Sequence, residues 1–227
     1  MNRPVPHQVV EPKWARACCH ERFERALRAR GYQLIAGVDE AGRGCLCGAV
    51  YAAAVVLSPD AAQLPLRDSK QLTSAQRERL ADLIRKLALG WSVAWATAEE
   101  IDRLNILEAS RLAMRRAVEG LSPRPDFLLV DAMELHLGIP ERALIKGDAR
   151  CRSIAAASIL AKVARDAAMR ELDRRYPVYG LARNKGYATP EHLEALRKFG
   201  PCPEHRLSFA PVRAATVLAQ ISSPPSG

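Results

Sequence analysis

The sequence of 227 residues lacks a long hydrophobic run, a Cys-x-x-Cys pair and an internal repeat. Its longest nearly unbroken apolar stretch, Cys45–Leu57, has only 13 residues, whereas a helix that crosses a bilayer needs about 20. The first residues, MNRPVPHQVVEPKW, contain no apolar segment of the kind that directs secretion. These absences argue against a membrane-spanning or secreted protein and predict a soluble, cytoplasmic chain that does not bind membranes.

The composition contains nothing that would prevent a folded core. Hydrophobic residues make up 48% and charged residues 26% of the chain, which are ordinary values for a globular protein and exclude wholesale disorder. A chain of this length predicts one domain with short appendages. We expect it to be a monomer.

Acidic residues are the scarcer charged type. The chain has 25 Asp and Glu against 34 Lys and Arg, so its formal net charge is +9, which favours an anionic partner, most often nucleic acid. Part of this excess lies in residues 1–30, for which we predict a basic, partly helical N-terminal extension. Two interpretations of this extension stay open, an arm that binds nucleic acid and a solvated helical face.

Six cysteines are present, but their spacing does not predict a zinc finger. Two segments, Cys18-Cys19-His20 and Cys202-Pro-Glu-His205, hold cysteine near histidine, yet neither has a second pair at the usual zinc spacing. Free and mostly buried thiols in a reducing compartment fit this pattern better.

Short apolar segments alternate with longer amphipathic segments, which is typical of an α/β fold. Predicted helices begin at the caps Thr73 and Thr97. Gly90 is expected to end the first of them, and the second either runs on or restarts near Asn105. The remaining expected elements are strands at 34–38, 49–57, 91–96, 127–130 and 144–145, and helices at 153–175 and 190–199.

Carboxylates follow three of the predicted strands. Asp39 and Glu40 come after the first strand, Asp131 after Phe127–Val130, and Asp148 shortly after the last. Strand ends form the sites of α/β sheets, and clustered carboxylates are tolerated when they bind cations such as Mg²⁺ or Mn²⁺. Two such ions can promote hydrolysis of a phosphodiester. The alternative is that each Asp only terminates its strand as a turn residue.

The adjacent pair Asp39-Glu40 sets a geometric condition on such a site. Neighbouring residues of a strand point to opposite faces. Both carboxylates can therefore serve one site only if the strand ends or bulges there, or if Glu40 acts from the side of a second ion. Gly42 and Gly44 would allow a sharp departure from the strand.

Six blocks of the sequence lie in order: GVDEAGRG (Gly37–Gly44), DSK (Asp68–Lys70), LLVDAMEL (Leu128–Leu135), IKGDARCRSIAAASILAKVARD (Ile145–Asp166), NKGYATPEH (Asn184–His192) and HRLSF (His205–Phe209). Together they resemble bacterial ribonuclease HII over residues 34–212. The resemblance implies an α/β, RNase H-like fold with a mixed five-stranded sheet flanked by helices and a helical C-terminal segment. We accordingly expect an extension at 1–30, a catalytic domain at 31–212 and a tail at 213–227 with a disordered end.

The resemblance also implies an activity. Such an endoribonuclease hydrolyses the RNA strand of RNA–DNA hybrids and nicks duplex DNA on the 5′ side of an embedded ribonucleotide, leaving 5′-phosphate and 3′-hydroxyl ends. The family's catalytic and metal-binding carboxylates, which hold two Mg²⁺ or Mn²⁺ ions during catalysis, fall on Asp39, Glu40, Asp131 and Asp148. Its substrate-binding residues fall on Gly42, Arg43, Gly44, Lys70, Lys146 and Tyr187. Two further family positions are Lys185, which would meet a phosphate, and Asp166, expected behind the ligands or on a helix surface.

The chain departs from the family pattern in two places. Cys45, Cys47 and Ala49 stand where Pro, Ala and Pro are usual, and Ala188 replaces a Gly next to Tyr187. Thiols close to the carboxylates suggest sensitivity to oxidation or to soft metals. Ala188 is expected to alter the backbone that aims Tyr187.

Three other functions are alternatives to the one that this resemblance implies. A ribonuclease HIII-like enzyme shares the catalytic core, but usually carries a longer N-terminal substrate-binding domain. A non-catalytic module that binds hybrids is disfavoured because all four carboxylates are present. A zinc-dependent nucleic-acid binder would need the zinc site that the cysteine spacing does not predict.

Overall fold

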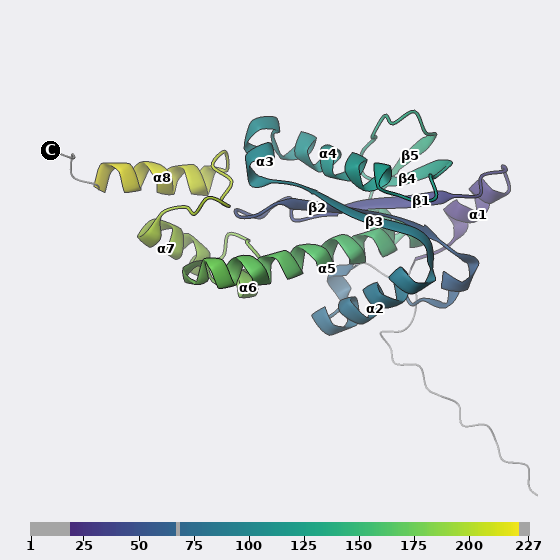
Figure 1. Cartoon of the computed structure of the whole chain (residues 1–227), viewed down its shortest axis with the longest axis horizontal. Helices are drawn as coiled ribbons and strands as arrows, with labels where there is room; N and C mark the ends of the chain where they lie inside the picture. Colours follow the sequence, from purple (N-terminus) through teal and green to yellow (C-terminus); the bar gives the residue numbers. More distant parts are fainter. Residues whose placement is uncertain (1–18, 67–68, 223–227) are drawn as a thin grey trace, which may run out of the picture.

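One mixed sheet of five strands forms the centre of the molecule (Figure 1). The structure is a computed structural model that describes residues 19–66 and 69–222. In the order β3-β2-β1-β4-β5, β1 pairs antiparallel with β2 and parallel with β4, which confirms the predicted fold class. The strands are β1 (Ile35–Ala41), β2 (Val50–Leu57), β3 (Ala88–Ala96), β4 (Phe127–Asp131) and β5 (Glu141–Leu144).

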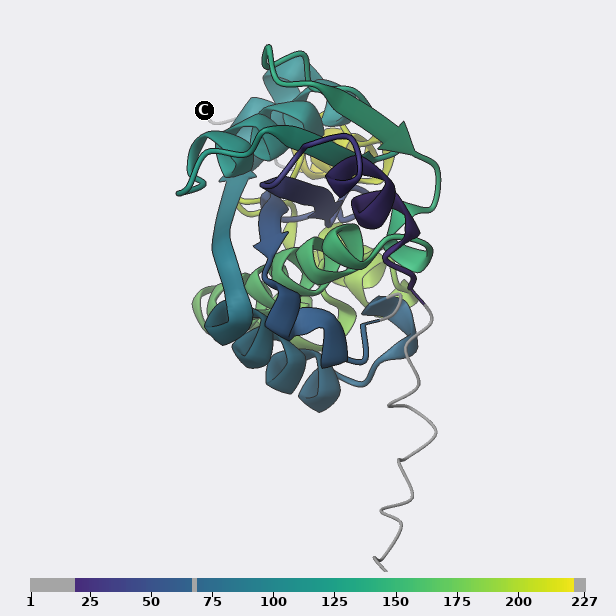
Figure 2. The same cartoon turned by 90° about the vertical axis from the view of Figure 1, so that its right-hand side faces the viewer.

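Helices cover both faces of this sheet. Figure 2 shows α4 on one face, and α5 and α2 on the other. The longer helices are α1 (Arg22–Arg28), α2 (Ser74–Leu87), α3 (Ala98–Leu104), α4 (Ile106–Glu119), α5 (Arg152–Arg175), α7 (Pro190–Phe199) and α8 (Ala210–Ser222). Short helical turns are η2 (Pro59–Gln63), η3 (Ser69–Gln71), η4 (Gly147–Ala149), η5 (Pro177–Tyr179) and α6 (Leu181–Asn184). Within the described ranges no helix is both long and apolar enough to pass through a bilayer.

Helix α5 packs directly on β1 because the facing side chains are small. The alanines from Ala155 to Ala157 are fully buried against Ala53 and Val55 of β2. Gly37 of β1 lies against the first turn of α5, where a Cβ atom would come within 2.0 Å of the Ser153 carbonyl carbon. The small residues on both elements therefore allow the close approach of helix and sheet.

Local sequence signals predicted most element boundaries. Thr73 and Thr97 both form capping boxes, and Asn105 caps the restarted helix α4. Gly90 was wrong as a helix end, since α2 leads straight into β3 at Ala88. Gly90 lies inside β3, where the Ser122 carbonyl oxygen would be 2.6 Å from a Cβ atom.

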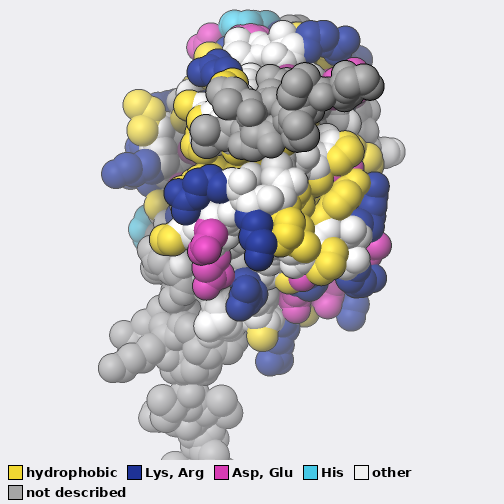
Figure 3. Space-filling view, turned by 90° about the vertical axis from the view of Figure 1, so that its left-hand side faces the viewer, with side chains coloured by type: hydrophobic (Ala, Val, Ile, Leu, Met, Phe, Trp, Pro, Cys, Tyr) yellow, Lys and Arg dark blue, Asp and Glu magenta, His cyan; other side chains and the backbone are white. Residues whose placement is uncertain are grey.

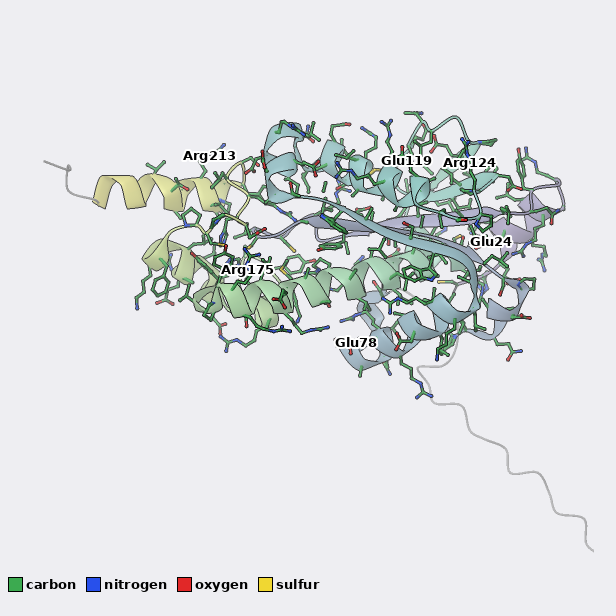
Figure 4. The ribbon with its side chains drawn as sticks, viewed as in Figure 1. Glu24, Glu78, Glu119, Arg124, Arg175 and Arg213 are labelled. Atoms are coloured by element: carbon green, nitrogen blue, oxygen red, sulfur yellow. The ribbon has the colours of Figure 1, made fainter. Side chains whose placement is uncertain are left out.

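The N-terminal segment contributes a cap to α5. Helix α1 is short, and its Glu24 is buried. Glu24 Oε1 accepts hydrogen bonds from the Ser153 backbone N–H and hydroxyl, both at 2.9 Å, at the start of α5. Figure 4 labels Glu24 at this end of α5 and Arg175 at the other. The carboxylate satisfies donors that an α-helix leaves unpaired at its N-terminus.

Two expected boundaries bear on the ends of the chain. The expected extension at 1–30 overlaps α1, and its residues 1–18 lie outside the described residues, as does Asp68. The expected boundary at 213 falls within α8, in which Val212 and Ala215 are buried. The expected disordered end lies outside the described residues, and the three-part division stays a prediction.

Substituting Gly37→Ala tests the contact of α5 with β1. The added methyl would lie 2.3 Å from the Ile154 nitrogen, and since both partners are backbone, we expect a loss of about 3 kcal/mol or more in the free energy of unfolding. Urea denaturation measures it. In the control Gly138→Ala, no atom lies within 4 Å and φ is +71°, so only about 1 kcal/mol should be lost. Equal losses would contradict this account.

Candidate active site at the ends of strands β1 and β4

An open cleft of about 230 Å³ lies where β1 and β4 end. Its floor is formed by carboxylates, and its walls by the loop after β1, by α5 and by Tyr187. The lining residues are Asp39, Glu40, Ala41, Gly42, Arg43, Gly44, Ser69, Lys70, Asp131, Asp148, Ser158, Lys162, Arg165 and Tyr187. All the predicted site residues are therefore brought together except Lys146 and Lys185, which do not line the cleft. Lys146 is exposed, and the Lys185 ammonium group donates to the Ala182 carbonyl oxygen.

Asp39 and Glu40 line the same cleft although they are neighbours in β1. The β1–β4 pairing stops at Val38–Val130, whereas β1 stays paired with β2 as far as Ala41. Beyond Val38, one side of β1 has no neighbouring strand, so carboxylates from both faces reach the same opening. We expected β1 itself to end or bulge at Asp39-Glu40. Instead, β1 continues and the neighbouring strand β4 ends its pairing early.

Asp131 and Asp148 are held together by the turn that precedes α5. The Gly147 N–H donates to Asp131 Oδ1 at 2.7 Å. A Cβ atom at Gly147 would come within 2.5 Å of Ile154 Cδ1 and 3.2 Å of Asp131 Oδ1. Asp148 lies in η4, is buried, and forms an ion pair at 3.5 Å with Lys70 Nζ. Glycine at 147 therefore allows this carboxylate pair to form.

Three carboxylates of the cleft, Asp39, Glu40 and Asp131, resist ionisation. Burial raises the pKa of Asp39 well above 3.8, and the charges of Glu40 and Asp131 raise it further. Burial also raises the pKa of Glu40, although Arg43 Nη1 lies 3.4 Å from its Oε1. The pKa of Asp131 is likewise raised by burial, against the lowering effect of the Gly147 N–H. The positive charges of the site therefore compensate its carboxylates only in part.

The donor set fits a hard divalent cation. Glu40 Oε2 is buried and has no hydrogen-bond partner among the described residues. Carboxylate oxygens are the ligands that Mg²⁺ and Mn²⁺ prefer. A cation placed among these groups would pair with Glu40 Oε2 and compensate both the burial and the mutual repulsion of the ionised carboxylates.

A buried arginine holds the loop Gly42–Gly44. Arg206 is fully buried and donates to the carbonyl oxygens of Gly42 and Arg43, both at 2.8 Å, and of Gly48 at 2.9 Å. Gly42 has a φ of +96°, a conformation that favours glycine. The loop backbone is therefore fixed from behind while Arg43 extends toward the cleft.

A second buried arginine supports Tyr187. The guanidinium of Arg165 lies 5.3 Å from the centre of the Tyr187 ring, and Nη1 donates to the Lys185 carbonyl oxygen at 2.7 Å. Tyr187 is 42% exposed, so its ring is supported on one side and accessible on the other. Gly44 lies directly beside it in the cleft wall, with 3.7 Å between the ring and a Cβ position. Ala188 does not have a left-handed backbone, so alanine fits there without strain.

Sequence reasoning missed several cleft residues on α5. Ser158, Lys162 and Arg165 all line the cleft. Asp166, expected behind the ligands or on a helix surface, is buried behind them and pairs with Lys162 at 2.9 Å and Arg165 at 3.1 Å. Ser158, Lys162 and Arg165 are spaced by four and three residues and therefore lie on one helix face. This spacing is the signal in the sequence that could have identified them as cleft residues.

Comparisons with known proteins agree with this arrangement. Residues 36–212 match the family described as ribonuclease HII. A ribonuclease HII of Solibacter usitatus is 60% identical over 196 residues, which cover 86% of this chain and 86% of that protein. The crystal structure of ribonuclease H2 from Pyrococcus horikoshii has a TM-score of 0.68 at 28% identity, covering 82% of this chain and 98% of that one. Bst-RNase HIII, solved in complex with Mn²⁺, has the same fold with a TM-score of 0.68 at 22% identity, covering 89% and 75% of the two chains.

Substituting Asp39→Asn should stabilise the metal-free protein. Because the folded-state pKa of Asp39 is raised above 3.8, its ionisation opposes folding, and the wild type loses stability as the pH rises from about 4 toward the folded-state value. Removing the charge should then add about 1 kcal/mol, or roughly 2–4 °C in Tm, in EDTA at neutral pH. The gain should vanish at acid pH. Asp82→Asn, on the exposed side of α2, is the control, and a lower Tm for Asp39→Asn at neutral pH would contradict the prediction.

Proposed function

The chain belongs to the ribonuclease HII family, and we propose on that basis that it is a metal-dependent endoribonuclease acting on RNA–DNA hybrids. In duplex DNA it nicks on the 5′ side of an embedded ribonucleotide, leaving 5′-phosphate and 3′-hydroxyl ends. The observation that carries this proposal is the cleft, in which four carboxylates face a glycine loop and an exposed aromatic ring. One wall has ligands for cations, and the other has surfaces for a nucleotide.

Asp39, Glu40, Asp131 and Asp148 would hold divalent cations, on which enzymes of this family depend. Bound Mg²⁺ or Mn²⁺ would supply a lowered pKa for the attacking water and stabilisation of the leaving 3′ oxygen. The protein fixes three of these carboxylates at the ends of β1 and β4 and the fourth, Asp148, in η4, so that little rearrangement is needed on binding. Ser158 assists this by hydrogen bonding to the Asp39 carboxylate.

The loop Gly42–Gly44 and Tyr187 would distinguish RNA from DNA. The 2′-hydroxyl group marks the ribose, and a site can detect it only by close contact. Gly44 lies directly beside the Tyr187 ring, because even a Cβ atom there would be in van der Waals contact with the ring at 3.7 Å. The loop backbone and the ring therefore form one continuous surface on which a sugar can pack. Since Arg206 holds the loop and Arg165 supports the ring, both recognition surfaces are preorganised.

Basic side chains around the cleft would contact the phosphates. Lys70 has a side chain that is 78% exposed, and that of Arg43 is 41% exposed. Lys162 lies on the α5 wall of the same cleft. Figure 3 shows further Lys and Arg side chains spread over the end of the molecule near α7 and α8. This distribution, together with the net charge of +9, suits a polyanionic substrate.

A nicking assay tests the catalytic role of the carboxylates. A duplex with one embedded ribonucleotide should be cut on its 5′ side in Mg²⁺ or Mn²⁺ but not in EDTA, and an all-DNA duplex should stay intact. Asp39→Asn should lower the rate by about 10³-fold or more, since it removes a ligand on which several kcal/mol of transition-state stabilisation depend. Asp82→Asn is the matched control. A gel shift without cutting by the wild type would instead indicate a hybrid-binding module.

Tyr187 variants test ribonucleotide recognition. Tyr187→Ala should reduce kcat/KM on the single-ribonucleotide duplex about 10- to 100-fold, because stacking on an aromatic ring contributes about 1–3 kcal/mol. Tyr187→Phe keeps the ring and should stay within about threefold of wild type. An equal loss in the two variants would mean that the hydroxyl group, and not the ring, makes the contact.

A further inference from the structure

Three soft metal ligands meet outside the carboxylate cleft. Cys47 comes from the loop between β1 and β2, and Cys202 and His205 come from the loop between α7 and α8. Their ligand atoms all lie within 4.8 Å of one another. Cys47 is 0%, Cys202 8% and His205 1% exposed, and an antiparallel bridge joins the backbones of Cys47 and His205. The two loops are therefore held in register at this point.

The segment Cys202-Pro-Glu-His205 forms a four-residue turn that brings its cysteine and histidine side chains together. The His205 N–H donates to the Cys202 carbonyl oxygen at 2.9 Å, and Cys202 Sγ lies 3.1 Å from His205 Nδ1. The turn thus directs the Cys202 sulfur and His205 Nδ1 toward the same point, which Cys47 Sγ also approaches. The thiolate is the form of cysteine that binds metals.

A chain of hydrogen bonds sets the tautomer of His205. Its Nδ1 accepts from the Cys202 N–H at 3.0 Å, so its proton is on Nε2. Nε2 lies 3.0 Å from His192 Nε2, and His192 Nδ1 donates to the Tyr187 carbonyl oxygen at 2.9 Å. A metal-binding histidine usually donates its other ring N–H to such a fixed acceptor. His192 therefore provides the support that a metal-bound His205 requires.

We propose that Cys47, Cys202 and His205 form a binding site for a thiophilic divalent cation of the Zn²⁺ type, distinct from the carboxylate cleft. Two sulfurs and one imidazole nitrogen suit Zn²⁺, which binds them at about 2.3 Å and 2.0–2.1 Å, and they do not suit Mg²⁺. Water takes the fourth position. On binding, the Cys47 thiol releases its proton, and the cation replaces the Cys202 N–H at the lone pair of His205 Nδ1.

Cobalt is the probe for this site because its spectrum reports the ligands. Full-length, reduced, metal-free protein without a histidine tag is titrated with Co²⁺ in excess Mg²⁺, which occupies the carboxylates. We expect sulfur-to-cobalt charge-transfer absorption and strong tetrahedral d–d bands that saturate at one equivalent and disappear when Zn²⁺ is added. Carboxylate ligands produce no such charge-transfer band.

Variants assign the signal to the three residues. Cys47→Ala restores the residue usual at this position in the resembling family, and it should abolish the band while circular dichroism stays unchanged. Cys202→Ala should do the same. Cys45→Ala is the matched control, because the Cys45 thiol donates to the Lys185 carbonyl oxygen and lies outside the cluster. It should bind Co²⁺ as the wild type does.

His192 variants test the supporting hydrogen bond. His192→Leu removes the acceptor for His205 Nε2–H and should weaken Co²⁺ binding about 10- to 100-fold. His192→Gln offers an acceptor oxygen and should lose less Co²⁺ affinity than His192→Leu does.

Two results would overturn the proposal. One is folded wild-type protein without a charge-transfer band, or with a band that survives in Cys47→Ala. The other is a thiol titration in denaturant, on protein purified without reductant, that finds two fewer thiols in the wild type but not in Cys47→Ala. The pair would then be a disulfide and not a metal site.

Discussion

The confinement of four carboxylates in one partly buried cleft is the constraint on which the rest of the structure depends. Burial, and after it repulsion between the carboxylates, raises the pKa values of Asp39, Glu40 and Asp131, so the fold must hold the four groups together against an unfavourable energy. It does so by placing them on the central strands and on the turn that leads into α5. Arg43 and Lys70 neutralise only part of this charge. Bound divalent cations would compensate the charge that remains.

The wall of the cleft that the loop Gly42–Gly44 and Tyr187 form depends on two buried arginines. Burying a guanidinium is unfavourable unless its donors are paired. Arg206 meets this condition with three backbone carbonyl oxygens, and burial lowers its pKa only to about 10, so it stays charged at neutral pH. Arg165 pairs with Asp166 and with the Lys185 carbonyl oxygen. Because a guanidinium donates in a fixed plane, each arginine specifies one backbone conformation for the segment that it holds.

The sequence predicted those parts of the molecule that depend on local patterns. Continuous apolar runs marked β1 and β4, and their ends located Asp39 and Asp131. The shared opening of Asp39 and Glu40 could not be predicted, because it depends on where the neighbouring strand ends. Gly90 was misassigned for a similar reason, because the residue that packs against it in β3, Ser122, is distant in the sequence. The meeting of Cys47 with Cys202 and His205 likewise required the tertiary fold, although one of the two segments already had a cysteine three residues before a histidine.

Helix α5 contacts both the carboxylate cleft and the loops that carry Tyr187 and Cys47, and so holds these parts in place. Its 24 residues span about 36 Å, and side chains along it contact each part of the site in turn. Ser158 reaches Asp39, and Arg165 supports the Tyr187 ring. Further along, Met169 packs so close to Gly48 that a Cβ atom there would lie 2.4 Å from its terminal carbon. Since Gly48 lies next to Cys47, the carboxylates, the aromatic wall and the cysteine cluster are all aligned by one helix. A displacement of α5 would therefore disturb all three together, which is why its contact with β1 at Gly37 constrains function as well as stability.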